Sequence, residues 1–177
     1  MIMKTKTFFI ALLAVMLLSA SHCEKEKDLN TLPPETQDGK NTFGCLIDGE
    51  LYVKGDAPWM HAQISAGYSK SRKSLNVSVY LHPNGYIYMD SFVQNINEQT
   101  PIALCYYSPH NGDYTCFCFG GRDIGNITIT KLDVENKIIS GRFSFDGQCS
   151  NEFVNPIGDS IVKITEGRFD IKLDIYE

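Results

Sequence analysis

The chain has 177 residues, of which 16 are basic and 21 acidic, giving a formal net charge of −5. A mildly acidic chain with dispersed charges lacks the basic face that neutralises phosphates, so the composition argues against nucleic-acid binding. It also provides no electrostatic attraction to anionic lipid, so any attachment to a membrane must come from a covalent lipid.

Residues 1–22 have the order of a secretory signal peptide: basic residues first, an apolar run over 7–18, then small residues. The apolar run is shorter than the ~20 residues that a transmembrane helix needs. Cys23 follows directly and precedes a charged stretch. The sequence therefore predicts a bacterial lipoprotein that is cleaved before Cys23 and acylated on it.

An alternative cleavage site exists, because His22 and Ala20 depart from the usual lipoprotein pattern. That pattern normally has a small residue directly before the cysteine and a leucine three residues before it. Ordinary cleavage after Ala20 would leave Cys23 as a plain thiol near the mature N-terminus.

Residues 23–41 predict a polar tether, because they contain Pro33-Pro34, several charges and almost no apolar residue. As a flexible coil, residues 24–41 would reach roughly 23 Å. Residues 42–177 have the size of one domain.

Beyond the tether, apolar residues recur with a period of two, as in half-buried strands, and no amphipathic helix is evident. We expect turns at residues 48–49, 83–85, 111–112, 135–137 and 166–167, where Gly or Asn is present. The sequence therefore predicts an all-β domain, an antiparallel meander of about eleven strands that forms a sandwich or a partly closed barrel.

The expected turns also fix which residues face each other and which are buried. The predicted cross-strand pairs are Leu46 with Leu51, Leu81 with Ile87, Ile129 with Phe143, and Ile164 with Phe169. The predicted core includes Phe143, Phe145, Phe169, Ile171 and Leu173.

Five cysteines follow Cys23, at positions 45, 105, 116, 118 and 149. A two-residue turn at 111–112 would set Cys105 opposite Cys118 at a non-hydrogen-bonded pair, where the Cα atoms come close enough for a disulfide. The same turn would set Cys116 opposite Tyr107. We expect a disulfide between Cys105 and Cys118; the alternative is that all five are reduced, small apolar residues.

No pattern for catalysis, metal or cofactor binding stands out. Gly158-Asp159-Ser160 resembles the start of an SGNH-hydrolase motif, but no histidine follows His110 to complete it. The histidines are isolated, and Cys116-x-Cys118 has no second ligand pair. We therefore expect no catalytic residue, no metal and no cofactor, and favour a protein that is not an enzyme.

Exposed aromatic residues offer a candidate binding surface. Trp59 is placed in a loop, and Tyr86, Tyr88 and Tyr107, together with Tyr80, are placed on strand faces opposite the core. Such a surface suits a flat ligand such as a glycan. The alternative is that these tyrosines reflect β-propensity alone.

Residues 41–52, Asn-Thr-Phe-Gly-Cys-Leu-Ile-Asp-Gly-Glu-Leu-Tyr, resemble the opening of a family of Bacteroidota cell-envelope lipoproteins. In that family a Leu-Pro-Pro-x-Thr tether, here Leu32–Thr36, leads into this segment, and residues 139–145 and 164–170 are similar to its C-terminal part. The resemblance implies a β-rich outer-membrane lipoprotein and no reaction. The acidic stretch after Cys23 resembles the surface-export signals of that group.

Together these features predict a lipid-anchored cell-envelope protein with a non-catalytic binding or interaction domain, whose partner is a glycan or an envelope protein. One alternative is a small polysaccharide-acting hydrolase, which would need a cleft holding two carboxylates. Another is a structural subunit of a surface assembly, which would need an uncovered strand edge.

Overall fold

The computed structural model describes residues 30–54, 64–82, 85–109, 115–119, 125–151 and 155–176. The regular structure in these ranges is entirely β, which confirms the expected fold class, and they include no helix long and apolar enough to cross a membrane. The ten strands are β1 (Thr42–Ile47), β2 (Glu50–Lys54), β3 (Ile64–Ser69), β4 (Ser74–His82), β5 (Tyr86–Phe92), β6 (Gln99–Ser108), β7 (Thr115–Phe119), β8 (Gly125–Asp133), β9 (Ile138–Asn151) and β10 (Asn155–Tyr176).

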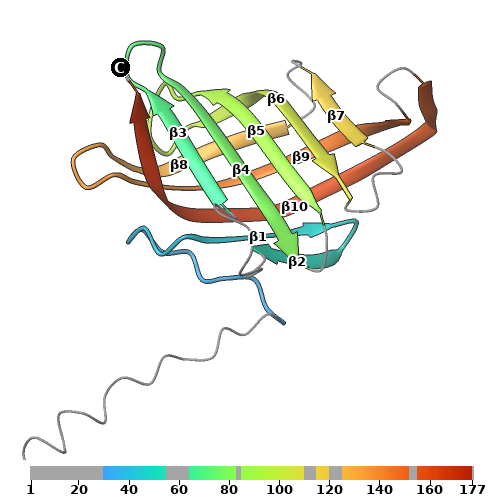
Figure 1. Cartoon of the computed structure of the whole chain (residues 1–177), viewed down its shortest axis with the longest axis horizontal. Helices are drawn as coiled ribbons and strands as arrows, with labels where there is room; N and C mark the ends of the chain where they lie inside the picture. The colour runs from blue at the N-terminus through green and yellow to red at the C-terminus, as the bar shows by residue number, and fades with distance from the viewer. Residues whose placement is uncertain are drawn as a thin grey trace, which may run out of the picture.

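The strands form one sheet that closes into a ring (Figure 1). Neighbours pair antiparallel from β3 to β6, β9 pairs antiparallel with β10, and β10 pairs with β3 in parallel to close the ring. This parallel pair departs from the expected antiparallel meander, and so do the pairings of β6 with β8 and of β7 with β9, which join strands that are not consecutive in the chain. Each of the ten described strands pairs with at least two others, although some segments, such as residues 155–162 of β10, pair with one strand alone. This ring-like pairing is that of a partly closed barrel.

The long strands hold different partners at the two ends of the barrel. Residues 164–170 of β10 pair with β1, whereas residues 173–176 pair with β3. In the same way, β6 pairs with β8 over residues 99–101 and with β7 over residues 104–107. The β1–β2 hairpin completes one end by reaching from β10 to β4.

The interior of the barrel is filled with apolar side chains. All five residues of the predicted core are buried, which confirms that prediction: Phe143, Phe145, Phe169, Ile171 and Leu173. The Phe143 ring lies 5.1 Å from that of Phe43 and 6.3 Å from that of Phe169, measured between ring centroids.

The expected turn at Glu166-Gly167 is wrong, because these residues form a bulge within the continuous strand β10. Ile164 pairs with Phe145 and Gly167 pairs with Phe143, so β10 has one extra residue between these positions. Glu166 has a positive φ of 51°. A Cβ on Gly167 would come within 2.5 Å of the Phe143 ring, so glycine is the residue that this close packing admits.

Of the expected turns at 48–49, 83–85 and 135–137, the first predicted the observed strand register and the other two did not. Leu46 pairs with Leu51 as predicted, and Asp48 and Gly49 both have positive φ, as a two-residue hairpin turn requires. Two loops are displaced: Ile87 pairs with Val79 rather than Leu81, and Phe143 with Ile127 rather than Ile129. The β4–β5 register is displaced by two residues. The β8–β9 register is displaced by one residue at Leu132–Ile139 and by a second at the bulge between Ile129 and Lys131, so Ile127 and Phe143 stay on their predicted face.

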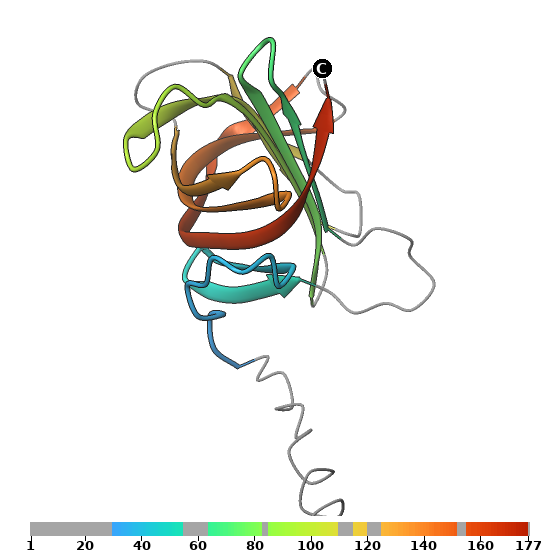
Figure 2. The same cartoon turned by 90° about the vertical axis from the view of Figure 1, so that its left-hand side faces the viewer.

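The described part of the expected tether, residues 30–41, lies against the barrel instead of forming a flexible coil (Figures 1 and 2). We call these residues the strap. It runs outside the ring of strands, over the outer face of β9 and β10 and beside β1. Only residues 23–29 of the expected tether remain outside the described ranges.

Candidate functional site

A continuous row of aromatic rings crosses the outer face of four neighbouring strands. We call it the aromatic row; its members are Tyr80 on β4, Tyr86 and Tyr88 on β5, Tyr106 on β6, and Phe117 on β7. Centroid distances between neighbouring rings are 4.9 Å (Tyr80–Tyr86), 5.6 Å (Tyr86–Tyr106), 5.4 Å (Tyr88–Tyr106) and 6.0 Å (Tyr106–Phe117).

Strand pairing explains why these rings meet. Tyr80 lies directly opposite Tyr86, and Tyr106 lies opposite both Tyr88 and Phe117 in its two neighbouring strands. Aromatic pairs across strands are favourable contacts in sheets. Because strands are ~4.8 Å apart, a row from β4 to β7 spans ~14 Å. Tyr80 is 40% exposed and the other members are half-buried, so the row is an open surface rather than a pocket.

The aromatic row lies on a face with almost no charge. Strands β4 to β7 contain no lysine or arginine, and their only carboxylate is that of Asp90. Burial raises the pKa of Asp90, and burial together with Asp90 and Tyr86 raises the pKa of Tyr88. Burial and the neighbouring tyrosines raise the pKa of Tyr106 to about 12. At neutral pH the Tyr88 and Tyr106 hydroxyls therefore remain protonated and can donate hydrogen bonds.

Two of the predicted ligand-binding residues belong to this row and one does not. Tyr86 and Tyr88 lie on the outer face as expected. The face predicted for Tyr107 is wrong: only 4% of it is exposed, and it packs in the interior against Gly85, while Tyr106 takes its place in the row. Trp59 lies outside the described residues.

The cysteines explain why Tyr107 was expected on the wrong face of β6. Cys105 pairs with Cys118 across β6 and β7 and forms the predicted disulfide, with Cα atoms 5.1 Å apart. The face that carries them points inward, whereas the expected position of Tyr107 would put the core on the opposite face of β6. Cysteine is among the most frequently buried residue types, and this tendency was the signal available in the sequence.

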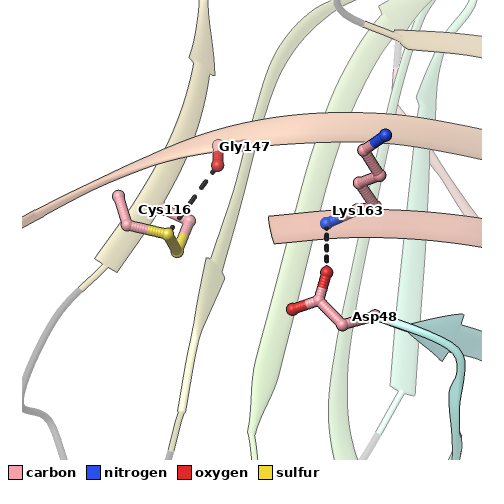
Figure 3. The surroundings of a disulfide bond; sticks show 5 residues. Asp48, Cys116, Gly147 and Lys163 are labelled. Atoms are coloured by element: carbon pink, nitrogen blue, oxygen red, sulfur yellow. Dashed lines mark hydrogen bonds between the residues drawn. A yellow bond between two sulfur atoms is a disulfide. The ribbon is translucent and has the colours of Figure 1, made fainter. Parts of the chain in front are cut away.

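A second disulfide, between Cys116 and Cys149, was not predicted (Figure 3). It joins β7 to β9, two strands that are adjacent only because the barrel brings them together. Cys45 is the free cysteine among the described residues, and burial raises its pKa to about 12. Near this disulfide, the backbone amide of Lys163 donates a 2.9 Å hydrogen bond to Asp48 and joins β10 to the β1–β2 turn (Figure 3).

A polar hollow of about 460 Å³ lies over β8, β9 and β10, where the strap forms one wall. Arg142 and Arg168 face each other across β9 and β10, and each is paired with a carboxylate. Arg142 Nε lies 2.9 Å from Glu35 of the strap, and Arg168 Nη2 lies 3.6 Å from Glu166.

A hydrolase would need two carboxylates in a cleft, and this hollow contains Glu35 and Glu166. A hydrogen bond from Arg142 holds the pKa of Glu35 below its usual value. A catalytic acid needs a raised pKa, so the lowered pKa of Glu35 does not suit it to that role. The Arg142–Glu35 ion pair links the strap to the barrel at this hollow, whereas Arg168 and Glu166 both belong to β10.

A metal site needs several ligating side chains close together. In the ranges that the structure describes, histidine, cysteine, aspartate and glutamate side chains do not gather into any group of three or more that could hold an ion. No protein-family model, curated protein or solved structure matches this chain.

Proposed function

We propose that this chain is a lipid-anchored protein of the bacterial cell envelope whose barrel binds carbohydrate, without catalysis, through the aromatic row. The observation that carries the proposal is the continuity of the row: five rings from four strands contact one another on one open face. The signal-like residues 1–22, Cys23 and the resemblance to Bacteroidota lipoproteins support the envelope location.

The chemistry of the row favours a neutral carbohydrate. A sugar ring presents C–H groups on one side and hydroxyls around its edge. Tyrosine matches both, because its ring is apolar and its hydroxyl forms hydrogen bonds. Strands β4 to β7 themselves contribute no lysine or arginine to attract an acidic sugar, and the carboxylate of Asp90 would repel one. A row of ~14 Å is long enough for a short stretch of extended chain to lie across the strands.

The two alternative functions receive less support from the described residues. The polar hollow contains two carboxylates, but each is ion-paired with an arginine. A surface assembly built by strand addition needs an open edge, whereas each described strand pairs with at least two others over part of its length.

Carbohydrate binding can be tested on Cys23→Ser protein, which lacks the acylation site. We expect the wild-type row to bind a neutral polysaccharide in affinity electrophoresis or calorimetry, and Tyr106→Ala to weaken binding about tenfold, which corresponds to ~1.4 kcal/mol. Tyr106 is chosen because its ring contacts three others in the row.

The matched control is Tyr176→Ala, which removes a tyrosine that is 56% exposed on β10, away from the row. It should bind as wild type does. Equal losses in the two variants, or binding that is stronger to acidic than to neutral polysaccharides, would contradict the proposal.

A further inference from the structure

The strap is tied to the barrel by one buried carboxylate. Asp170 lies on the outer face of β10 but is only 1% exposed, because the strap covers it. It accepts hydrogen bonds from Thr36 Oγ1 (2.6 Å), from Ser140 Oγ (2.8 Å), and from the backbone amides of Asp38 (3.1 Å), Gly39 (2.8 Å) and Lys40 (3.2 Å). Three consecutive amides thus surround one anion, and the strap is docked here.

Contacts on either side of Asp170 hold the rest of the strap. Pro33 packs so closely on β1 that a Cβ on Gly44 would come within 2.5 Å of it. Lys131 on β8 donates a 2.9 Å hydrogen bond to the backbone carbonyl of Gln37, and the side chain of Asn41 accepts a 2.8 Å hydrogen bond from the backbone of Lys172. The strap is therefore fixed along its length, from residue 33 to residue 41.

Docking shortens the connection between the barrel and Cys23. Seven residue steps separate Cys23 from Asn30, and fully extended chain covers at most ~3.5 Å per residue, which gives a limit of ~25 Å. An undocked tether up to Thr42 would extend to roughly 66 Å by the same measure. A domain of this size is roughly 37 Å across. The docked connection is therefore shorter than the domain is wide, whereas the undocked one is longer.

The strap and the aromatic row lie on opposite walls of the barrel. The strap covers β9 and β10, and the row is centred on β5 and β6. Around the ring, β5 is three strands from β10 in one direction and four in the other. Figures 1 and 2 place the strap outside β1 and β10, on the side away from the ring's interior.

We infer that the docked strap orients the protein on the membrane, with the β9–β10 wall turned toward the bilayer and the aromatic row directed away from it. This inference rests on the proposed lipid anchor at Cys23. A tether shorter than the width of the domain prevents the barrel from turning over, so the row stays accessible to carbohydrate beyond the membrane surface.

The orientation can be measured by energy transfer on the acylated full-length protein. A donor dye is attached through a p-azidophenylalanine at position 163, on β10, or at position 76, on β4; both positions are exposed on the outer face. The vesicles are phosphatidylcholine with an acceptor dye on a fraction of the headgroups. We expect more efficient transfer from position 163 than from position 76.

Asp170→Asn should undock the strap, and Asp174→Asn, which changes an exposed carboxylate on the same strand, is the matched control. We expect Asp170→Asn to raise amide exchange at residues 38–40 at least tenfold, to leave exchange in the core strands unchanged, and to remove the difference between the two dyes. Asp174→Asn should keep that difference.

Each failure has a distinct meaning. Wild-type protein that does not float with vesicles, or Cys23→Ser protein that does, overturns the anchor and the orientation with it. Equal transfer from the two dyes in protein that floats overturns the orientation alone. A difference that persists after residues 38–40 lose their protection overturns the role of the strap. Carbohydrate binding, measured on the soluble form, is independent of all three.

Discussion

At the scale of single residues, Asp170 shows how a charge can be buried on the outside of a barrel. Phe169 and Ile171 point into the core, so alternation directs Asp170 outward, and the strap then removes it from water. Burial raises its pKa, but the hydrogen bonds from Thr36, Gly39, Ser140 and Asp38 outweigh burial and leave the pKa below its ordinary value. The ionised form is therefore the one that the folded state favours.

This pKa shift predicts a dependence of stability on pH. A carboxylate whose pKa falls on folding stabilises the folded state above its unfolded pKa of ~3.9 and loses that contribution as the pH falls through its folded pKa. In the strap beside it, Asp38 and Lys40 form an ion pair whose charged atoms are 3.2 Å apart. In urea unfolding, Asp170→Asn should be less stable than wild type at pH 7 by about 1.5–3 kcal/mol. That difference should shrink below pH 4; a constant difference from pH 7 to pH 3 would contradict it.

Phe169 provides a test of the core. It is 3% exposed, its ring lies 6.3 Å from that of Phe143, and it covers Gly141 so closely that a Cβ there would come within 2.7 Å. Truncating a buried phenylalanine costs ~3–5 kcal/mol, a large part of the ~5–15 kcal/mol that stabilises a domain. Phe169→Ala should therefore lower the urea midpoint strongly, while Lys172→Ala, an exposed position on the same strand, should leave it close to wild type. Similar midpoints for the two variants would contradict the observed faces of β10.

At the scale of elements, β7 is unusual because a strand of five residues is cross-linked to both of its neighbours. Cys116 and Cys118 point to the same face, one bonded to β9 and the other to β6. The Cys105–Cys118 bond could be predicted from the sequence, because both residues belong to one hairpin. The Cys116–Cys149 bond could not, because the pairing of β7 with β9 depends on closure of the barrel.

The two disulfides of β7 should contribute measurably to stability. Closing a loop of ~15 residues is worth about 3 kcal/mol in the chain-entropy model. We expect dithiothreitol to lower the melting temperature of wild type and to increase amide exchange in β7 first. A variant with alanine at positions 105, 116, 118 and 149 should melt lower and should not respond to the reductant. Cys45→Ala, which changes the free cysteine, should keep the full response, and a wild-type melting temperature that ignores the reductant would refute this role.

Turns show where local sequence information was sufficient. Asp48-Gly49 gave the correct register, because two residues with positive φ admit one hairpin geometry. Glu166-Gly167 has a similar composition but lies within a strand, since the Phe143 ring opposite Gly167 and the continued pairing with β9 favour a bulge. Turn chemistry alone does not distinguish these two outcomes, and the difference comes from packing across strands.

At the scale of the whole molecule, the period-two pattern was enough to predict an all-β fold and the members of its core. The pattern could not predict that the sheet closes into a ring. The parallel pairing of β10 with β3 that closes it joins segments about 100 residues apart, as the Leu173–Ala66 pair shows. Docking of the strap could not be predicted from the sequence for a related reason. Its polar composition is typical of a coil, and it is ordered by a carboxylate that lies 130 to 134 residues further along the chain.

The candidate site was predicted in part. Tyr86 and Tyr88 were placed correctly because β5 has a clear alternation of buried and exposed residues. Tyr106 was missed because either face of β6 could be apolar: one has leucine and aromatic rings, the other has cysteine and isoleucine. The structure shows which face of β6 is buried, because Tyr107 and the two disulfides lie in the interior.

Closure of the sheet also has a consequence for how copies of this protein behave when they are crowded together. Unpaired edge strands act as templates for aggregation, and proteins usually protect them with charges, prolines or bulges. Here each described strand pairs with at least two others, so most of its backbone hydrogen bonds are formed within one molecule. We therefore expect crowded copies to expose little strand edge through which they could pair with one another.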